Sequence, residues 1–253
     1  MPVTEPTPVL EVEDVRRAFG GVHAVDGVSF ALARGEIRAL IGPNGAGKST
    51  FFNILTGQLR ADAGDVRWHG RSILGLPPHA IWRLGISRTF QITATFGTLT
   101  ALENVQVARL SHTGRSRALV TPAARLETAP SRTLLEHVGL AEQATRPAGV
   151  LAYGDLKKLE LAIALANDPA LLLLDEPTAG MAPAERGALM ALTARIARER
   201  QLTVLFTEHD MDVVFAVADR IMVLHQGRVI ADGPPTAVRA DAQVQAVYLG
   251  EAS

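Results

Sequence analysis

The chain has 253 residues, of which 47% are hydrophobic and 20% are charged, and its 25 basic and 26 acidic side chains give a formal net charge of -1. This composition is too apolar for a disordered chain, and the near balance of interspersed charges argues against a surface that binds nucleic acid. The absence of cysteine excludes disulfides, thiolate metal sites and thiol nucleophiles, and it fits a reducing cytosol.

Neither a secretory signal nor a membrane span is expected. The N-terminal sequence MPVTEPTPVLEVEDV carries prolines and acids where a signal peptide needs a basic start and an apolar stretch. The apolar stretch from Leu161 to Leu174 is broken by Asn167, Asp168 and Pro169, well short of the ~20 apolar residues that cross a bilayer. If the protein works at a membrane, we expect another chain to supply the crossing.

The first part of the chain predicts strands, a glycine-rich loop and two short helices. In chain order, we expect strands at Leu10–Val15, Val25–Leu32 and Ile37–Ile41, a helix that includes Phe51–Leu59, a turn-rich stretch with GDVRWHG (64–70), a short helix that starts at the prolines of PPHAIWRLG (77–85), and a strand in ISRTFQ that ends at Gln91. The strand Ile37–Ile41 leads directly into GPNGAGKST, so strand, loop and helix follow one another there.

The rest of the chain continues this alternation around a less regular middle. Leu99–Leu110 has a helical pattern, whereas Ser111–Ser131 has no clear period and is expected to be a loop or a partly helical insertion. Further along, we expect helices at Asp155–Asn167, Pro183–Arg200 and Met211–Ala218, and strands at Ala170–Leu174, Leu202–Phe206 and Ile221–Leu224. Asp155 is the expected cap of its helix. The alternation implies an α/β fold with a mostly parallel sheet that is covered on both faces.

The glycine-rich loop satisfies the phosphate-binding pattern G-x-x-x-x-G-K-[ST] in the context of strand, loop and helix that this pattern requires. Its residues are Gly42, Pro43, Asn44, Gly45, Ala46, Gly47, Lys48, Ser49 and Thr50. Glycines let successive backbone N–H groups point inward, and the helix that follows presents its positive end to a phosphate. Lys48 is expected to reach the β and γ phosphates, and Ser49 to ligate Mg²⁺. The alternative is an ordinary glycine turn before a helix.

A second motif places two carboxylates after an apolar strand. Leu171–Leu174 is followed by Asp175 and Glu176, at the edge where open α/β sheets bind ligands. Asp175 is expected to hold Mg²⁺ through water, and Glu176 to orient and deprotonate the attacking water, because adjacent side chains at a strand end diverge. Taken alone, the pair could equally mark a strand that enters a solvated turn. The phosphate loop upstream favours the catalytic interpretation.

The order of motifs resembles that of ABC transporter ATPases over essentially the whole chain. These motifs are the phosphate loop, Gln91, the pentapeptide Leu151, Ala152, Tyr153, Gly154 and Asp155, the run LLLLDEP, and His209. The resemblance implies a P-loop NTPase with a mostly parallel core sheet, an N-terminal antiparallel β subdomain and a helical subdomain. The helical subdomain is expected at about 92–150 and a C-terminal extension at about 232–253, within a single nucleotide-binding domain of residues 1–253. ATP and Mg²⁺ are the implied ligands.

The same resemblance implies a role for several of these residues. The pentapeptide is the signature sequence, which contacts the γ phosphate of ATP held by a partner subunit in a head-to-tail dimer. Gln91 links the γ phosphate and the metal to the helical subdomain, and His209 contacts the γ phosphate. Phe19 matches the position where an aromatic ring stacks on adenine. From the residues alone, Gln91 and His209 are polar residues at the ends of elements, and Phe19 is a core residue.

More narrowly, several motifs resemble those of the ATPase subunits of branched-chain amino-acid importers. They are GISRTFQ, TALENVQVA, LAYG followed by LELA, DEPTAGM and the terminal YLGE. This likeness implies a motor subunit that binds permease subunits at the cytoplasmic face of the inner membrane, with a solute-binding protein as an indirect partner and no nucleic acid. The alternatives are an importer of urea, amides or aromatic acids, a soluble ABC ATPase that acts on nucleic acid or on a scaffold, and a P-loop kinase or GTPase.

The chain departs from the broad family at its partner-facing edge. Ala152 stands where the signature usually has serine, and Asp155 where it usually has glutamine. The stretch Ala179–Ala182 lacks the acid or amide that the family often places at its fourth position. We therefore expect a heterodimer with a second, different ATPase and two unequal ATP sites. The alternative is a symmetric homodimer in which Asp155 caps its own helix.

Overall fold

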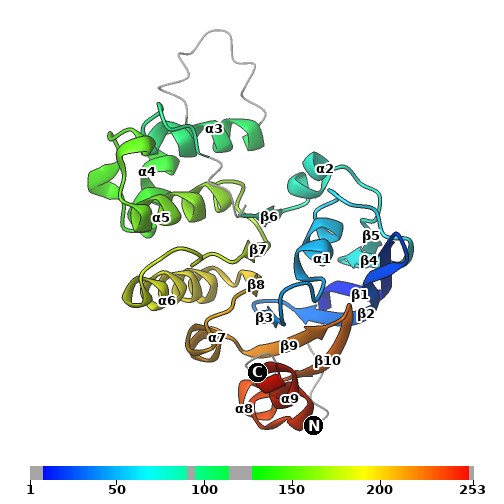
Figure 1. The fold of residues 1–253 in the computed structure, drawn as a ribbon. Coiled ribbons are helices and arrows are strands. Elements are labelled where there is room, and N and C mark those ends of the chain that lie inside the picture. The colour runs from blue at the N-terminus through cyan, green and yellow to red at the C-terminus, as the bar shows by residue number, and fades with distance from the viewer. Residues whose placement is uncertain (1–7, 90–94, 114–126, 251–253) are drawn as a thin grey trace, which may run out of the picture.

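The computed structural model describes residues 8–89, 95–113 and 127–250. Figure 1 shows a central sheet with a smaller sheet beside it, and a group of helices set off at one end of the molecule. Within the described ranges, no helix combines the length and the apolar character that a membrane crossing needs.

An antiparallel sheet of four strands forms the N-terminal part, in the order β2-β1-β4-β5. Its strands are β1 (Pro8–Phe19), β2 (Val22–Ala33), β4 (Ala63–Trp68) and β5 (Arg71–Ser72). β1 and β2 extend the predicted strands at both ends. The turn-rich interpretation of residues 64–70 was wrong, because most of this stretch belongs to β4, which buries Val66 and Trp68 and pairs with β1.

The core sheet has six strands in the order β10-β9-β3-β8-β7-β6. They are β3 (Ile37–Ile41), β6 (Ile86–Arg88), β7 (Leu171–Asp175), β8 (Thr203–Thr207), β9 (Arg220–His225) and β10 (Arg228–Gly233). Neighbouring strands are parallel except β10, which is antiparallel to β9 and was not predicted. The predicted mostly parallel sheet is therefore confirmed. The strand in ISRTFQ ends at Arg88, and Gln91 lies outside the described residues.

Helices cover both faces of the core sheet. The helices of the described structure are α1 (Lys48–Leu55), α2 (Pro78–Arg83), α3 (Ala101–Thr113), α4 (Thr128–His137), α5 (Tyr153–Ala164), α6 (Pro183–Arg200), α7 (Met211–Val217), α8 (Pro235–Ala240) and α9 (Ala242–Gly250), with short 3-10 turns at Ala141–Gln143 and Ala148–Val150. The helices α3, α4 and α5 pack together at one end of the molecule (Figure 1). That they form a subdomain bounded at about 92–150 stays a prediction.

Two helix boundaries differ from simple expectation. The stretch Ser111–Ser131 is helical at both ends, where it completes α3 and begins α4, while residues 114–126 lie outside the described structure. Asp155 does not cap α5. This helix begins at Tyr153 with Ala152 in the N-cap position, so Asp155 lies in the first turn, where its Oδ1 accepts a 3.0 Å hydrogen bond from Lys158. A carboxylate there still interacts favourably with the helix dipole.

Apolar residues alternate between the two faces of the core sheet. In β7, Leu171 and Leu173 join the core on the side of α1 and the N-terminal sheet, whereas Leu172 and Leu174 join the core that includes α5, α6 and α7. Successive side chains of a strand point to opposite faces, so a strand that is covered on both faces is apolar at every position. This explains the unbroken run of leucines that carries Asp175 to the sheet edge.

Candidate active site

The glycine-rich loop joins β3 to α1 and requires glycine at two positions for steric reasons. Gly42 and Gly47 have φ values of 152° and 106°. A Cβ atom on Gly42 would lie 2.1 Å from the carbonyl oxygen of Leu224, and one on Gly47 would lie 2.0 Å from the carbonyl oxygen of Ala24. No side chain fits at such distances, so these glycines allow the loop to lie against β9 and β2.

A cavity of about 170 Å³ opens at this loop. It is lined by Ala24, the loop from Asn44 to Thr50, and Glu176. The structure therefore brings Glu176 together with Lys48 and Ser49. The Lys48 side chain is buried, and its Nζ donates hydrogen bonds to the loop carbonyls of residues 42 and 43 at 2.5 and 3.0 Å.

Asp175 ends β7 and is buried beside two partners. Its Oδ1 accepts a 2.9 Å hydrogen bond from the Thr207 hydroxyl, and its Oδ2 forms a 2.6 Å ion pair with the Arg88 guanidinium. Thr207 ends the neighbouring strand β8 and lies opposite Asp175 in the register. Neither partner was identified from the sequence. In the sequence, Arg88 is marked only as a charged residue at the end of the short strand ISR. Thr207 is marked only as a polar residue at the end of an apolar strand.

Glu176 leaves the strand end in a different direction. Its φ of +48° is left-handed, a conformation that residues other than glycine rarely adopt. Its backbone N–H donates a 3.0 Å hydrogen bond to the Thr207 hydroxyl. One hydroxyl therefore holds the side chain of Asp175 and the backbone of Glu176. The turn lets the two carboxylates diverge, with the first inside the sheet and the second at the loop cavity.

His209 faces Glu176 from the connection between β8 and α7. Its Nε2 lies 2.9 Å from Glu176 Oε1. The backbone N–H of His209 donates to Glu208 Oε2 at 3.0 Å, and Asp210 caps α7 by accepting from the Val213 N–H. Hydrogen bonds of Glu208 and Asp210 thus fix the backbone on either side of the histidine. An imidazole in this position can orient a carboxylate that accepts a proton from water.

The pentapeptide lies apart from this cavity. Leu151 and Ala152 precede α5, and the next three residues form its first turn. The Tyr153 hydroxyl donates a 2.8 Å hydrogen bond to the Ala179 carbonyl, in the loop that follows Glu176. Among the described residues, the cavity wall includes no member of the pentapeptide. This placement is compatible with the expected contact with a partner's ATP.

One other predicted site residue stands outside the cavity wall, and a second lies outside the described residues. Phe19 ends β1 with an exposed ring, and the Arg17 guanidinium lies 4.7 Å from the ring centre. Phe19 is therefore a surface ring rather than a core residue, and it can stack on a planar ligand. Gln91 falls outside the described residues.

The oxygen donors at the site fit Mg²⁺. The Ser49 hydroxyl and the carboxylates of Asp175 and Glu176 are hard ligands, and Mg²⁺ usually takes one or two carboxylates together with phosphate oxygens and water. In the part of the chain that the structure describes, no three His, Cys, Asp or Glu side chains gather into a metal cage. A hydroxyl and carboxylates beside a phosphate loop suit a cation that is held jointly with a nucleotide.

Comparisons with known proteins agree with this geometry. A family model described as ABC transporter matches residues 25–179, and one described as branched-chain amino acid ATP-binding cassette transporter matches residues 228–253. The high-affinity branched-chain amino acid transport ATP-binding protein BraF of Pseudomonas aeruginosa is 42% identical over 97% of this chain and 99% of its own. The corresponding LivG protein of Escherichia coli K12 is 41% identical over the same shares.

Among solved structures, the ADP conformation of MJ1267, an ATP-binding cassette of an ABC transporter, is 30% identical to the chain. It superimposes with a TM-score of 0.84, over 96% of this chain and 99% of that one. The ABC transporter family model covers more than half of the chain. BraF and LivG are more than 40% identical to it over nearly its whole length. Together these matches show the family of the chain. The chain belongs to the ATP-binding proteins of ABC transporters, in the branched-chain amino acid transport family, and is an ATPase of that type.

Proposed function

We propose that this chain hydrolyses ATP to drive the import of branched-chain amino acids through permease subunits supplied by other polypeptides. The observation that carries the proposal is the Glu176–His209 pair at the phosphate-loop cavity, in a chain whose last residues match the branched-chain family model. The names of BraF and LivG, which state branched-chain amino acid transport, support this cargo. The chain would work at the cytoplasmic face of the inner membrane, where a solute-binding protein delivers cargo to the permeases from the other side.

Different residues around the cavity have different roles in ATP hydrolysis. The loop N–H groups bind the phosphates of ATP, and Lys48 exchanges its two loop carbonyls for phosphate oxygens. Ser49 and Asp175 would hold Mg²⁺, which would neutralise charge on the β and γ phosphates. Glu176 orients the attacking water and accepts its proton. His209 holds the Glu176 carboxylate and faces the γ phosphate.

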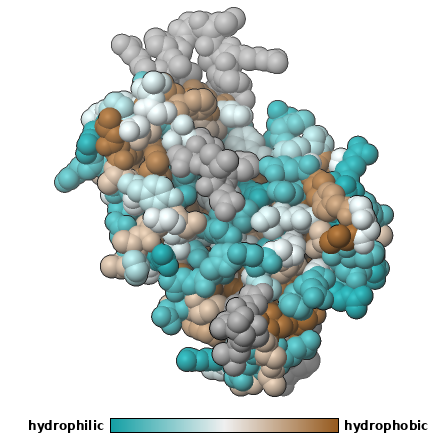
Figure 2. Space-filling view, viewed as in Figure 1, coloured by the Kyte–Doolittle hydropathy of each residue, from teal (hydrophilic) through white to brown (hydrophobic). Residues whose placement is uncertain are grey.

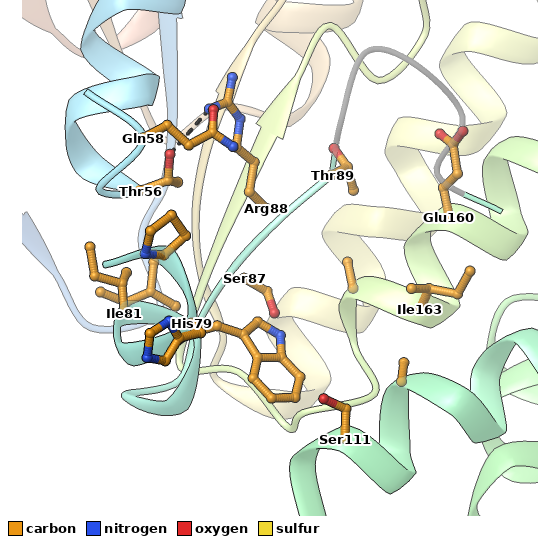
Figure 3. A pocket seen from close by; sticks show the side chains of 15 residues that line it. Thr56, Gln58, His79, Ile81, Ser87, Arg88, Thr89, Ser111, Glu160 and Ile163 are labelled. Carbon is orange, nitrogen blue, oxygen red and sulfur yellow. Dashed lines mark hydrogen bonds between the residues drawn. The ribbon is translucent and has the colours of Figure 1, made fainter. Parts of the chain in front are cut away.

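The proposed docking site for a permease is a groove of about 400 Å³ between the core sheet and the helical end. Figure 3 shows His79 and Ile81, from the side of α2, across an open space from Ser111 of α3 and Ile163 of α5. Glu160 lines the same groove, and its buried Oε1 has no hydrogen-bond partner in the described structure. Buried polar atoms are normally satisfied, so a docking segment that carries a donor fits this groove.

We also propose that the surface around Gln91–Val107 contacts the permease. Residues 91–94 lie outside the described structure, Phe96 and Val107 are exposed, and Ala108, next to Val107, lines the groove. On the face shown in Figure 2, hydrophobic residues gather in separate patches, one of them over the helical end. Because the sequence has no cysteine, a thiol introduced at Phe96 is the only one in the chain. It should crosslink to a permease in vesicles, whereas a thiol at Val22, which is 69% exposed in the N-terminal sheet, should not. A permease crosslink from position 22 alone would place the docking surface elsewhere.

A different ATPase is the proposed dimer partner. The carboxylate of Asp155 is paired with Lys158, so its repulsion of a neighbour's triphosphate is smaller than the sequence alone suggests. The missing hydroxyl at Ala152 therefore carries most of the expected asymmetry. Transport by a complex with Glu176→Gln in this chain should be lower than transport by a complex with the matching change in the partner. Equal residual transport from both complexes would favour a symmetric pair.

Uptake into vesicles that contain this chain, its partner ATPase and the permeases tests the function. Labelled leucine, isoleucine or valine should accumulate when ATP and the solute-binding protein are present, and Glu176→Gln should stop the accumulation. Preferential uptake of urea, an amide or an aromatic acid would assign a related cargo. ATP hydrolysis that responds to no permease would reject a transport role.

A further inference from the structure

We propose that Arg88 is a positioning residue that connects the permease groove to the carboxylate of Asp175. The inference rests on the proposed function, because it assigns a way for the permease to regulate the same ATP site. Arg88 ends β6, at one edge of the core sheet, and lies beside Leu173 in the parallel register with β7. Its side chain therefore starts two residues from Asp175 on the neighbouring strand.

Among the described residues, the Arg88 guanidinium has partners on two sides. Its Nη2 donates to Asp175 Oδ2 at 2.6 Å. Its Nη1 donates to Asn53 Oδ1 at 2.7 Å and to Thr56 Oγ1 at 3.2 Å, and a longer contact of 3.4 Å reaches Gln58 Oε1. The side chains of Arg88 and Asp175 are only 8% and 6% exposed. Because arginine carries its donors in one rigid planar fork, a displacement on the Nη1 side also moves Nη2.

The Nη1 side belongs to the permease groove. Thr56, Gln58 and Arg88 all line it, and Figure 3 shows the first two beside the guanidinium. Gln58 is exposed at the surface, whereas Asp175 is buried and is not part of the groove wall. A docking segment that contacts Gln58 or Thr56 therefore meets the partners of Arg88 before it meets any catalytic group.

The hydrogen bond from Nη2 affects how readily a cation can bind to the Asp175 carboxylate. With Nη2 on Oδ2 and the Thr207 hydroxyl on Oδ1, each carboxylate oxygen already accepts a hydrogen bond. A positive charge at this distance opposes the approach of a second cation to the same carboxylate. Arg88 thus restrains Asp175 while the groove is empty, and a segment in the groove changes that restraint.

A Mg²⁺ titration of fluorescent ATP-analogue binding to the isolated chain tests the charge of Arg88. Arg88→Met should lower the half-saturating Mg²⁺ concentration by about threefold or more, whereas Arg88→Lys, which keeps the charge, should stay within about twofold of wild type. Arg38→Met is the matched control, since Arg38 is equally buried and paired with carboxylates, Glu36 and Asp232, on the same sheet. If Arg88→Met does not fold, Arg88→Gln replaces it. An unchanged or raised Mg²⁺ requirement in the folded neutral variant overturns the proposal.

ATP hydrolysis in permease vesicles tests the connection to the groove. Arg88→Lys keeps the charge but replaces the rigid fork with one ammonium on a flexible stem. It should therefore lose most of the change in hydrolysis that permeases cause in the wild type, with its Mg²⁺ dependence within about twofold of wild type. A full response in Arg88→Lys overturns the connection. If the wild-type chain itself does not respond to permeases, the proposed function fails, while the Mg²⁺ titration still decides whether Arg88 restrains Asp175.

Discussion

Replacing Thr207 by valine removes one hydroxyl and keeps the shape of the side chain. This hydroxyl donates to Asp175 Oδ1 at 2.9 Å and accepts from the Glu176 N–H at 3.0 Å, and Thr207 is fully buried, so bulk water does not reach it. A hydrogen bond to a charged acceptor contributes about 1.5–3 kcal/mol, and a buried N–H left unsatisfied costs about 1–3 kcal/mol. Because the two bonds share one hydroxyl, we expect the free energy of unfolding to fall by about 2–4 kcal/mol rather than by the full sum.

Urea unfolding measures this loss as a lower midpoint at constant slope. Thr207→Ser keeps the hydroxyl and should lose less than about 1 kcal/mol. Thr193→Val is a matched control, because within the described structure its buried hydroxyl donates only to the Leu189 carbonyl of α6, and its loss should be small. ATP turnover should fall by about tenfold or more in Thr207→Val, since both acids lose their common anchor. A Thr207→Val chain as stable as Thr193→Val and as active as the wild type would refute the bridging role.

Lys48→Ala should weaken ATP binding, because it removes the cation at the phosphates. Glu176→Gln should keep ATP bound and lower turnover by about 10²-fold or more. Equal losses of ATP affinity in the two variants would contradict the role of Glu176. Thr100→Ala should destabilise the chain by about 0.5–2 kcal/mol in urea, because Thr100 and Glu103 form a reciprocal cap at the start of α3. Hydrogen bonds from the N–H and the hydroxyl of Thr100 lower the pKa of Glu103 in the folded chain. The cap therefore stabilises the fold fully at pH values above the ordinary pKa of a glutamate, and this stabilisation is lost as the pH falls through the lowered pKa of Glu103. Urea midpoints of wild type and Thr100→Ala should therefore converge in acid; a constant gap would contradict the cap.

The elements with clean local signals could be predicted from the sequence. The bounds of β3 agree because Ile37–Ile41 is a short, mostly apolar run that ends at a glycine loop. Those of α6 agree because Pro183 suits the first turn of a helix, where its missing N–H has no partner to lose. The phosphate loop could be predicted for the same reason, since its glycines and Lys48 are adjacent in the chain.

Contacts between distant segments could not be predicted in this way. The partners of Asp175 lie 87 residues before it, at Arg88, and 32 residues after it, at Thr207, and only the strand order brings them together. β10 has no regular alternation of buried and exposed residues, so no period marks it as a strand. Asp155 is a preferred capping residue, but the helix starts two residues earlier, which no propensity of Asp155 itself could indicate.

The apolar core that contains Leu134 and Leu135 of α4 continues without a break through Leu159 of α5 to Leu172 of the core sheet. Because α5 packs on α3 and α4 as well as on α6, a chimera that exchanged only residues 92–150 would separate these helices from the one on which they rest. A graft that preserves their packing runs from the end of β6 to the start of β7, residues 89–170. Such a graft leaves the phosphate loop and both acids in the recipient, so that the groove wall formed by α3 and α5 of one relative can be combined with the ATP chemistry of another.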